Sequence, residues 1–233
     1  VLIGPDHNLY IRSGHAIGGR MVLRYDGVTG ALIDTFAVEN SYEKRYINHM
    51  VFGPDGNAYT LSGSRIDRYD GSTGDFLERF ATATDTTQVS YTHFEFGPDG
   101  NLYVVNVAER HVYRYDVTTG VFKDTFIASE HGGLDGPFGL TFGPDGHLYV
   151  ASFYEGTNKV LRYDGGSGRF MDTFVASGSG GLDQPFDVVF GQDGSLFVSS
   201  FGTDEVLRYE GGTGTFIDAF VSQNGGGLDG PGG

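Results

Sequence analysis

The sequence predicts an all-β protein, a five-bladed β-propeller with four-stranded antiparallel blades. Three observations lead to this fold class. One segment of about 47 residues recurs five times, turn residues divide each copy into four short strands, and the two ends of the chain fit together as parts of one copy. A lone four-stranded sheet cannot bury both of its faces, so repeats of this kind are expected to stack around an axis.

The recurring segment is a Gly-Pro-Asp-Gly turn followed by an apolar strand. It reads Gly-Pro-Asp-Gly-Asn-Leu-Tyr-Val in residues 97–104. Related copies begin 49, 44, 46 and 48 residues apart, at Gly4, Gly53, Gly97, Gly143 and Gly191. Each copy continues with Arg-Tyr-Asp, or Arg-Tyr-Glu in the last one, in which we expect the tyrosine to pack between blades and the arginine to pair with a carboxylate.

Turn residues divide every copy into four strands. In the fourth copy we expect strands at 138–142, 148–152, 160–163 and 170–175. The Asp-Gly turn between the first two is typical of a tight hairpin, because glycine readily adopts the positive φ that such turns need. The predicted repeats are 1–46, 47–90, 91–136, 137–184 and 185–233, which together form one propeller domain over 1–233.

The two ends of the chain indicate a closed ring. Residues 226–231 repeat the Gly-Gly-Leu-Asp-Gly-Pro that leads into the fourth copy, and residues 1–6 continue that copy without a gap. Counted across the join, the spacing is 46 residues. We therefore expect adjacent N- and C-termini to close the ring of five blades.

Composition and charge exclude some classes of partner. Hydrophobic residues make up 39% of the chain, which is enough for a core, and no run of 18 apolar residues is present, so we expect no membrane insertion. The formal net charge of −15 opposes binding to a phosphate backbone, and we expect no nucleic acid partner. Few Lys and Arg residues, much Gly and no Cys are typical of an exported protein, secreted or periplasmic. The oligomeric state stays open.

The repeated segments resemble NHL repeats. Gly-Pro-Asp-Gly-Asn-Leu-Tyr-Val and Gly-Leu-Asp-Gly-Pro-Phe-Gly-Leu are also similar to segments of the streptogramin (virginiamycin B) lyase and gluconolactonase propellers. The resemblance covers the whole chain and implies the propeller fold. It also implies a range of functions, from protein interaction to metal-dependent lyase activity. Streptogramin lyases typically follow the turn with Trp-Phe-Thr, whereas this chain has no Trp.

Function is expected where the copies differ without a structural need. Each innermost strand ends at a Phe or Ile, and the residue three positions earlier is equivalent in all five copies. We expect these five residues to form a ring at the axial opening and call their place the ring position. It is occupied by His49, His93, Gly139, Asp187 and Gly233. Two imidazoles and a carboxylate suit one divalent transition metal (Zn, Fe, Ni or Cu), and the glycines are expected to leave room for substrate. Two alternatives stay open: a polar ligand without a metal, or histidines that only bond to loop carbonyls.

Six further residues are predicted to line the same pocket. Arg12 and Asn106, which follow second strands, are candidates to hold an anion and to orient a ligand. Glu155 is a candidate general base. Tyr46 and Tyr91 would form walls of the pocket, and Tyr154 comes from a neighbouring loop together with Glu155.

Three functions remain open from the sequence. The first is an exported propeller that binds a small molecule or metal ion in a polar pocket at the axial opening. The second is a metal-dependent lyase or hydrolase of streptogramin-lyase type, in which a bound cation polarises a carbonyl or activates water. The third is a non-catalytic protein-interaction scaffold. No nucleophile elbow, phosphate loop or Cys–His pair is present in the sequence to favour another enzyme class.

Overall fold

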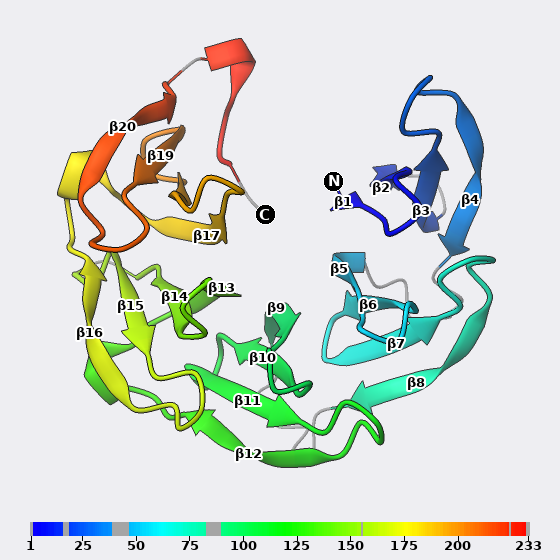
Figure 1. Cartoon of the computed structure of the whole chain (residues 1–233), viewed down its shortest axis with the longest axis horizontal. Helices are drawn as coiled ribbons and strands as arrows, with labels where there is room; N and C mark the ends of the chain where they lie inside the picture. Colours follow the sequence, from blue (N-terminus) through cyan, green and yellow to red (C-terminus); the bar gives the residue numbers. More distant parts are fainter. Residues whose placement is uncertain are drawn as a thin grey trace. The chain divides into compact units, whose positions relative to one another are not determined.

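The computed structural model describes residues 2–15, 19–38, 47–82, 90–154, 156–223 and 225–231, apart from the side chains of residues 14, 15, 19, 20, 38 and 82. These residues form five four-stranded antiparallel sheets, each with its strands in chain order (Figure 1). The predicted fold class, an all-β propeller with five blades, is confirmed. Within the described ranges, no helix has the length and apolar character needed to cross a bilayer.

The chain divides into two compact units. The first comprises residues 1–91 and 118–121 and contains two blades. Blade 1 has strands β1 (Leu2–Ile3), β2 (Leu9–His15), β3 (Gly19–Tyr25) and β4 (Leu32–Val38). Blade 2 has strands β5 (Ile47–Phe52), β6 (Ala58–Ser62), β7 (Arg65–Tyr69) and β8 (Phe76–Thr82).

The second unit comprises residues 92–117 and 122–233 and contains the other three blades. Blade 3 has strands β9 (Tyr91–Phe96), β10 (Leu102–Asn106), β11 (His111–Tyr115) and β12 (Phe122–Ile127). Blade 4 has strands β13 (Pro137–Phe142), β14 (Leu148–Ser152), β15 (Lys159–Tyr163) and β16 (Phe170–Val175). Blade 5 has strands β17 (Pro185–Phe190), β18 (Leu196–Ser200), β19 (Glu205–Tyr209) and β20 (Phe216–Val221). Closure of the ring through the termini would join the two units and stays a prediction, as does the single domain.

The strands expected in the fourth repeat agree with blade 4 to within one residue at every end. Three short 3-10 turns were not predicted: η1 (His131–Gly133), η2 (Ser179–Gly181) and η3 (Gly225–Gly227). The middle residue of each turn is a glycine with a φ between 64° and 67°, a left-handed conformation that favours glycine. The Gly-Gly pairs of these segments therefore serve the turn that leads from one blade toward the next.

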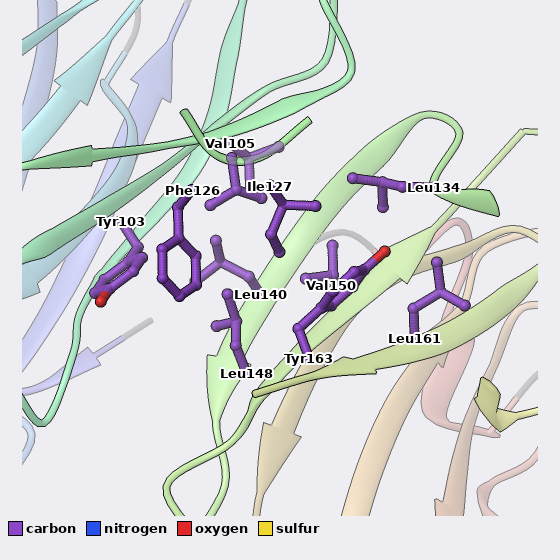
Figure 2. Packing of buried hydrophobic residues seen from close by; sticks show 11 residues of the cluster. Tyr103, Val105, Phe126, Ile127, Leu134, Leu140, Leu148, Val150, Leu161 and Tyr163 are labelled. Carbon is purple, nitrogen blue, oxygen red and sulfur yellow. The ribbon is translucent and has the colours of Figure 1, made fainter. Parts of the chain in front are cut away.

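One hydrophobic core of the second unit lies between blades 3 and 4. Figure 2 shows Tyr103, Phe126 and Ile127 of blade 3 beside Leu140, Leu148 and Tyr163 of blade 4. Most of these side chains come from the faces of neighbouring sheets, with Leu134 added from the connecting loop. The apolar residues of the repeat are thus buried by the next blade, as the stacking argument requires.

The repeated tyrosine of the second strand links this packing to the first hairpin turn. In blade 4, the ring of Tyr149 packs edge-on against Phe174 and against Phe190 of blade 5, with centroids 4.8 and 4.9 Å away. Its hydroxyl donates to Asp145 Oδ2 at 2.9 Å. The arginine of the Arg-Tyr-Asp tripeptide pairs with the fourth strand in every blade, through Arg24–Asp34, Arg68–Glu78, Arg114–Asp124, Arg162–Asp172 and Arg208–Asp218.

Blade 5 carries Phe197 at the position of Tyr149, which makes a reciprocal test possible. Tyr149→Phe keeps the ring packing but removes the hydrogen bond to Asp145, so we expect the free energy of unfolding to fall by about 1 kcal/mol. Phe197→Tyr adds a hydroxyl within reach of the equivalent Asp193, and we expect no loss of stability. Urea unfolding of both variants measures this. An unchanged midpoint for Tyr149→Phe would contradict the role given to the hydroxyl.

Candidate functional site

Two of the predicted ring residues meet in the second unit. His93 lies on β9 and Asp187 on β17, and the distance from Nδ1 to Oδ1 is 3.8 Å, with 12% and 26% of the side chains exposed. The Asp187 backbone N–H donates to Ser199 Oγ at 2.8 Å, while its Oδ1 accepts the N–H of Val188 at 2.9 Å. The carboxylate is therefore held in place beside the imidazole.

Gly139 occupies the same ring position on β13, between the two strands that carry these residues. A Cβ atom built on it would lie 2.4 Å from Asp187 Oδ1 and 2.8 Å from the carbonyl oxygen of Phe186. The expectation that this glycine leaves room for substrate is wrong, because Asp187 and its backbone take up that space. On the other side, Thr92 Oγ1 donates to the carbonyl oxygen of Phe138 at 3.1 Å. The innermost strands of blades 3, 4 and 5 thus approach one another closely at the ring position.

Glu95 is a further residue of this site that was not predicted. It follows His93 by two positions on β9, so the two side chains share a face of the strand. Its Oε2 is buried and has no hydrogen-bond partner among the residues that the structure describes. The pKa of Glu95 is raised to about 7, mainly by burial. The negative charge of Asp187 also raises it, while hydrogen bonds from Thr141 and the Phe142 backbone lower it in part.

A repeat comparison would have found Glu95. The residue before the Phe or Ile that ends each innermost strand is uncharged in the other four copies, which carry Leu2, Val51, Thr141 and Val189. The ring position that carries His49, His93 and Asp187 lies two residues earlier, so a comparison confined to that position does not include Glu95. We call His93, Glu95 and Asp187 the inner-strand site.

The other predicted metal ligand, His49, lies partly buried on β5 of the first unit. Its meeting with His93 and Asp187 would involve both units and stays a prediction. In the part of the chain that the structure describes, no three His, Asp, Glu or Cys side chains gather into a group that could hold a metal ion. Gly233 of the same ring position lies outside the described residues.

The structure describes four of the six residues predicted to line the pocket. Asn106 is fully buried. Its Nδ2 donates to Glu109 Oε2 at 2.9 Å, and its Oδ1 accepts the N–H of Ala108 at 3.2 Å. The amide therefore stabilises the β10–β11 turn. Tyr154 is 39% exposed, and the Arg110 guanidinium lies over its ring. Arg12 is partly buried on β2, and Tyr91 is buried at the start of β9. Tyr46 and Glu155 lie outside the described residues.

The inner-strand site combines one imidazole with two carboxylates. Burial is the main reason for the raised pKa of Glu95, and the negative charge of Asp187 adds a smaller contribution in the same direction. A positive group placed between the two carboxylates would favour the ionised form of both. The site is thus suited to accept a cation or a strong hydrogen-bond donor, and Glu95 is suited to exchange a proton near neutral pH.

Comparison with solved structures supports the fold. Virginiamycin B lyase from Staphylococcus aureus, solved as an inactive variant with quinupristin, matches 94% of this chain and 68% of its own, at 16% identity and a TM-score of 0.68. A gluconolactonase from Xanthomonas campestris matches 91% of this chain and 71% of its own, at 18% identity and a TM-score of 0.66. The calcium-binding protein regucalcin from Agrobacterium tumefaciens matches 87% and 68%, at 16% identity and a TM-score of 0.63. No family model and no curated protein matches the sequence. At these identities the likeness establishes the propeller fold and its similarity to the lyase and gluconolactonase propellers.

Proposed function

We propose that this five-bladed propeller binds a small, positively charged ligand at the inner-strand site. The observation that carries the proposal is the meeting of His93 with Asp187 at 3.8 Å, on the same face of β9 as Glu95, whose Oε2 is buried without a hydrogen-bond partner among the described residues. A buried polar atom without a partner is costly, and a ligand that donates a hydrogen bond to it removes that cost. The excess of negative charge on the chain adds a general attraction for cations.

An organic ammonium group fits the described residues better than a metal ion. A metal ion needs several ligands at fixed distances, and the described side chains form no such group. An ammonium group needs only acceptors, which the two carboxylates supply. The metal-binding hypothesis, with Zn, Fe, Ni or Cu as candidates, needs His49 in addition, and the experiment below includes it.

An NMR titration of ¹⁵N-labelled protein tests the proposal. The probes are n-butylamine hydrochloride, CaCl₂ and ZnCl₂, each added separately, with NaCl as the reference. We expect n-butylamine to shift amide signals of β9 and β17, and Glu95→Gln/Asp187→Asn to weaken that binding at least tenfold. The exposed Glu130→Gln serves as the matched control and should bind as the wild type does. Binding that is equally strong in the double variant would overturn the proposal.

A second candidate function is catalysis of the lyase or hydrolase class. It is favoured by the buried carboxyl group of Glu95, whose pKa of about 7 suits general acid–base chemistry near neutral pH. The test substrates come from the structural neighbours: quinupristin, and gluconolactone as a small lactone. We expect any turnover to fall at least 100-fold in Glu95→Gln and to persist in Glu130→Gln. Turnover that survives Glu95→Gln would exclude Glu95 as the acid or base.

The third candidate is a protein-interaction scaffold, for which neither amine binding nor substrate turnover would depend on the inner-strand site. Amine binding by Glu95→Gln/Asp187→Asn and turnover by Glu95→Gln therefore separate it from the other two candidates.

A further inference from the structure

Five aromatic side chains of blades 4 and 5 gather beside the inner-strand site. We call them the aromatic surface, which consists of Phe138, Phe153, Tyr154, Phe186 and Phe201. The ring centroid of Phe138 lies 4.5 Å from that of Phe153 and 4.9 Å from that of Phe186. Phe201 lies 6.1 Å from both Phe153 and Phe186. Large aromatic side chains are in contact here without being fully covered, since Tyr154 is 39% and Phe201 40% exposed.

The repeat itself does not require these aromatic residues. Phe138 and Phe186 precede the ring position, where the second and third copies carry Asn48 and Thr92. Phe153 and Phe201 follow the second strand, where those copies carry Gly63 and Val107. Blades 2 and 3 fold with the same strand order although they lack aromatic residues at these positions. An apolar cluster that the fold does not need, and that stays partly exposed, indicates a binding surface.

The aromatic surface is continuous with the inner-strand site. Phe186 directly precedes Asp187 on β17, and the pairing of β17 with β18 is interrupted between Pro185 and Val188, where both residues lie. The backbone of Phe186 also lies against Gly139. One ligand can therefore contact the aromatic rings and the carboxylate of Asp187 together.

Two nearby carboxylates already have partners. Asp135 pairs with Arg110 at 3.1 Å, and Asp183 accepts a hydrogen bond from Asn158 Nδ2 at 2.7 Å. Glu95 Oε2, in contrast, is buried without a hydrogen-bond partner among the described residues, and Asp187 Oδ1 lies 3.8 Å from His93 Nδ1. The positive group of a ligand is thus directed to the end of the aromatic surface that borders Asp187.

We propose that the aromatic surface binds an aromatic ring of the ligand whose positive group lies at the inner-strand site, so that the ligand class is a small aromatic amine. This inference rests on the proposed function and specifies its ligand. Four of the five residues are phenylalanines without polar atoms, which favours an apolar ring over the hydroxyl groups of a sugar. Aromatic rings also attract a cation held near their faces, which adds to the pull of the carboxylates.

Three probes test the inference in the same NMR titration: benzylamine, n-butylamine and benzyl alcohol. We expect benzylamine to bind at least tenfold more tightly than either n-butylamine, which lacks the ring, or benzyl alcohol, which lacks the charge. Phe201→Ala should reduce the affinity for benzylamine to that for n-butylamine and leave n-butylamine unchanged. Phe153→Leu, which keeps an apolar side chain, gives a second test if Phe201→Ala does not fold. Phe220→Ala, an exposed phenylalanine on β20, is the matched control and should change nothing.

The outcomes separate the two proposals. If benzylamine binds no more tightly than n-butylamine, and both still depend on Asp187, the aromatic inference is wrong and the proposed function stands. If neither amine binds, both are overturned. If benzylamine binds more tightly but Phe201→Ala and Phe153→Leu have no effect, the ring lies elsewhere and the inference is also wrong.

Discussion

Replacing Gly139 with alanine is expected to lower the free energy of unfolding by about 3 kcal/mol or more and to abolish ligand binding at the inner-strand site. The new Cβ atom would lie 2.4 Å from Asp187 Oδ1 and 2.7 Å from its Cα. The Cα belongs to the backbone, so rotation of a side chain cannot relieve the contact. Strands β13 and β17 must separate, which displaces Asp187 from His93. Urea unfolding and the amine titration measure the two effects.

Gly166→Ala provides the matched control in the same blade. A Cβ atom at that position would have a single neighbour, Asp164 Oδ1 at 3.7 Å, which is an ordinary contact. We expect it to leave stability and binding nearly unchanged. If Gly139→Ala were as stable as Gly166→Ala, the close approach of the inner strands described above would be wrong.

Stability that depends on the protonation of Glu95 is the second large effect expected. The Glu95 carboxyl has its pKa raised by burial from 4.5 to about 7 in the folded chain. Between these pH values the folded protein holds a proton that the unfolded chain has released. The free energy of unfolding should therefore fall as the pH rises from about 4.5 to 7, by up to about 1.4 kcal/mol per pH unit, and level off above pH 7.

Glu95→Gln removes the titrating group and keeps the shape of the side chain. The stability of the wild type minus that of the variant should fall across the same pH window, as measured by urea unfolding at pH 4.5, 5.5, 6.5 and 7.5. Taking the difference cancels carboxyl groups that titrate alike in both proteins. Glu130→Gln, an exposed position, should show a constant difference. A constant difference for Glu95→Gln as well would mean that Glu95 titrates normally in the folded chain.

Much of the architecture followed from local sequence patterns. The Gly-Pro-Asp-Gly turns and the Arg-Tyr-Asp tripeptides repeat at near-constant spacing, and both the strand ends of blade 4 and the number of blades were predicted from them. A hairpin depends on a few adjacent residues, so its position is readable from the chain. The 3-10 turns were missed because they are single turns, too short to show helical periodicity.

The candidate site was only partly predictable. Counting along the repeat placed His93 and Asp187 at equivalent positions, and the structure brings them within 3.8 Å. Glu95 was missed, although its position differs from every other copy, because only one position per strand was compared. The free space expected at Gly139 depended on how closely β17 approaches, which no pattern within one strand can show.

The sequence by itself determined the repeat, the four strands of each blade and the residues that occupy equivalent positions, because these depend on turns and on alternation within short segments. Only the tertiary structure decided which side chains meet. The burial of Glu95 beside Asp187 and the grouping of Phe138, Phe153, Phe186 and Phe201 arise from strands far apart in the chain. Their contacts depend on the distance and angle between neighbouring blades, which are set by the packing of whole sheets.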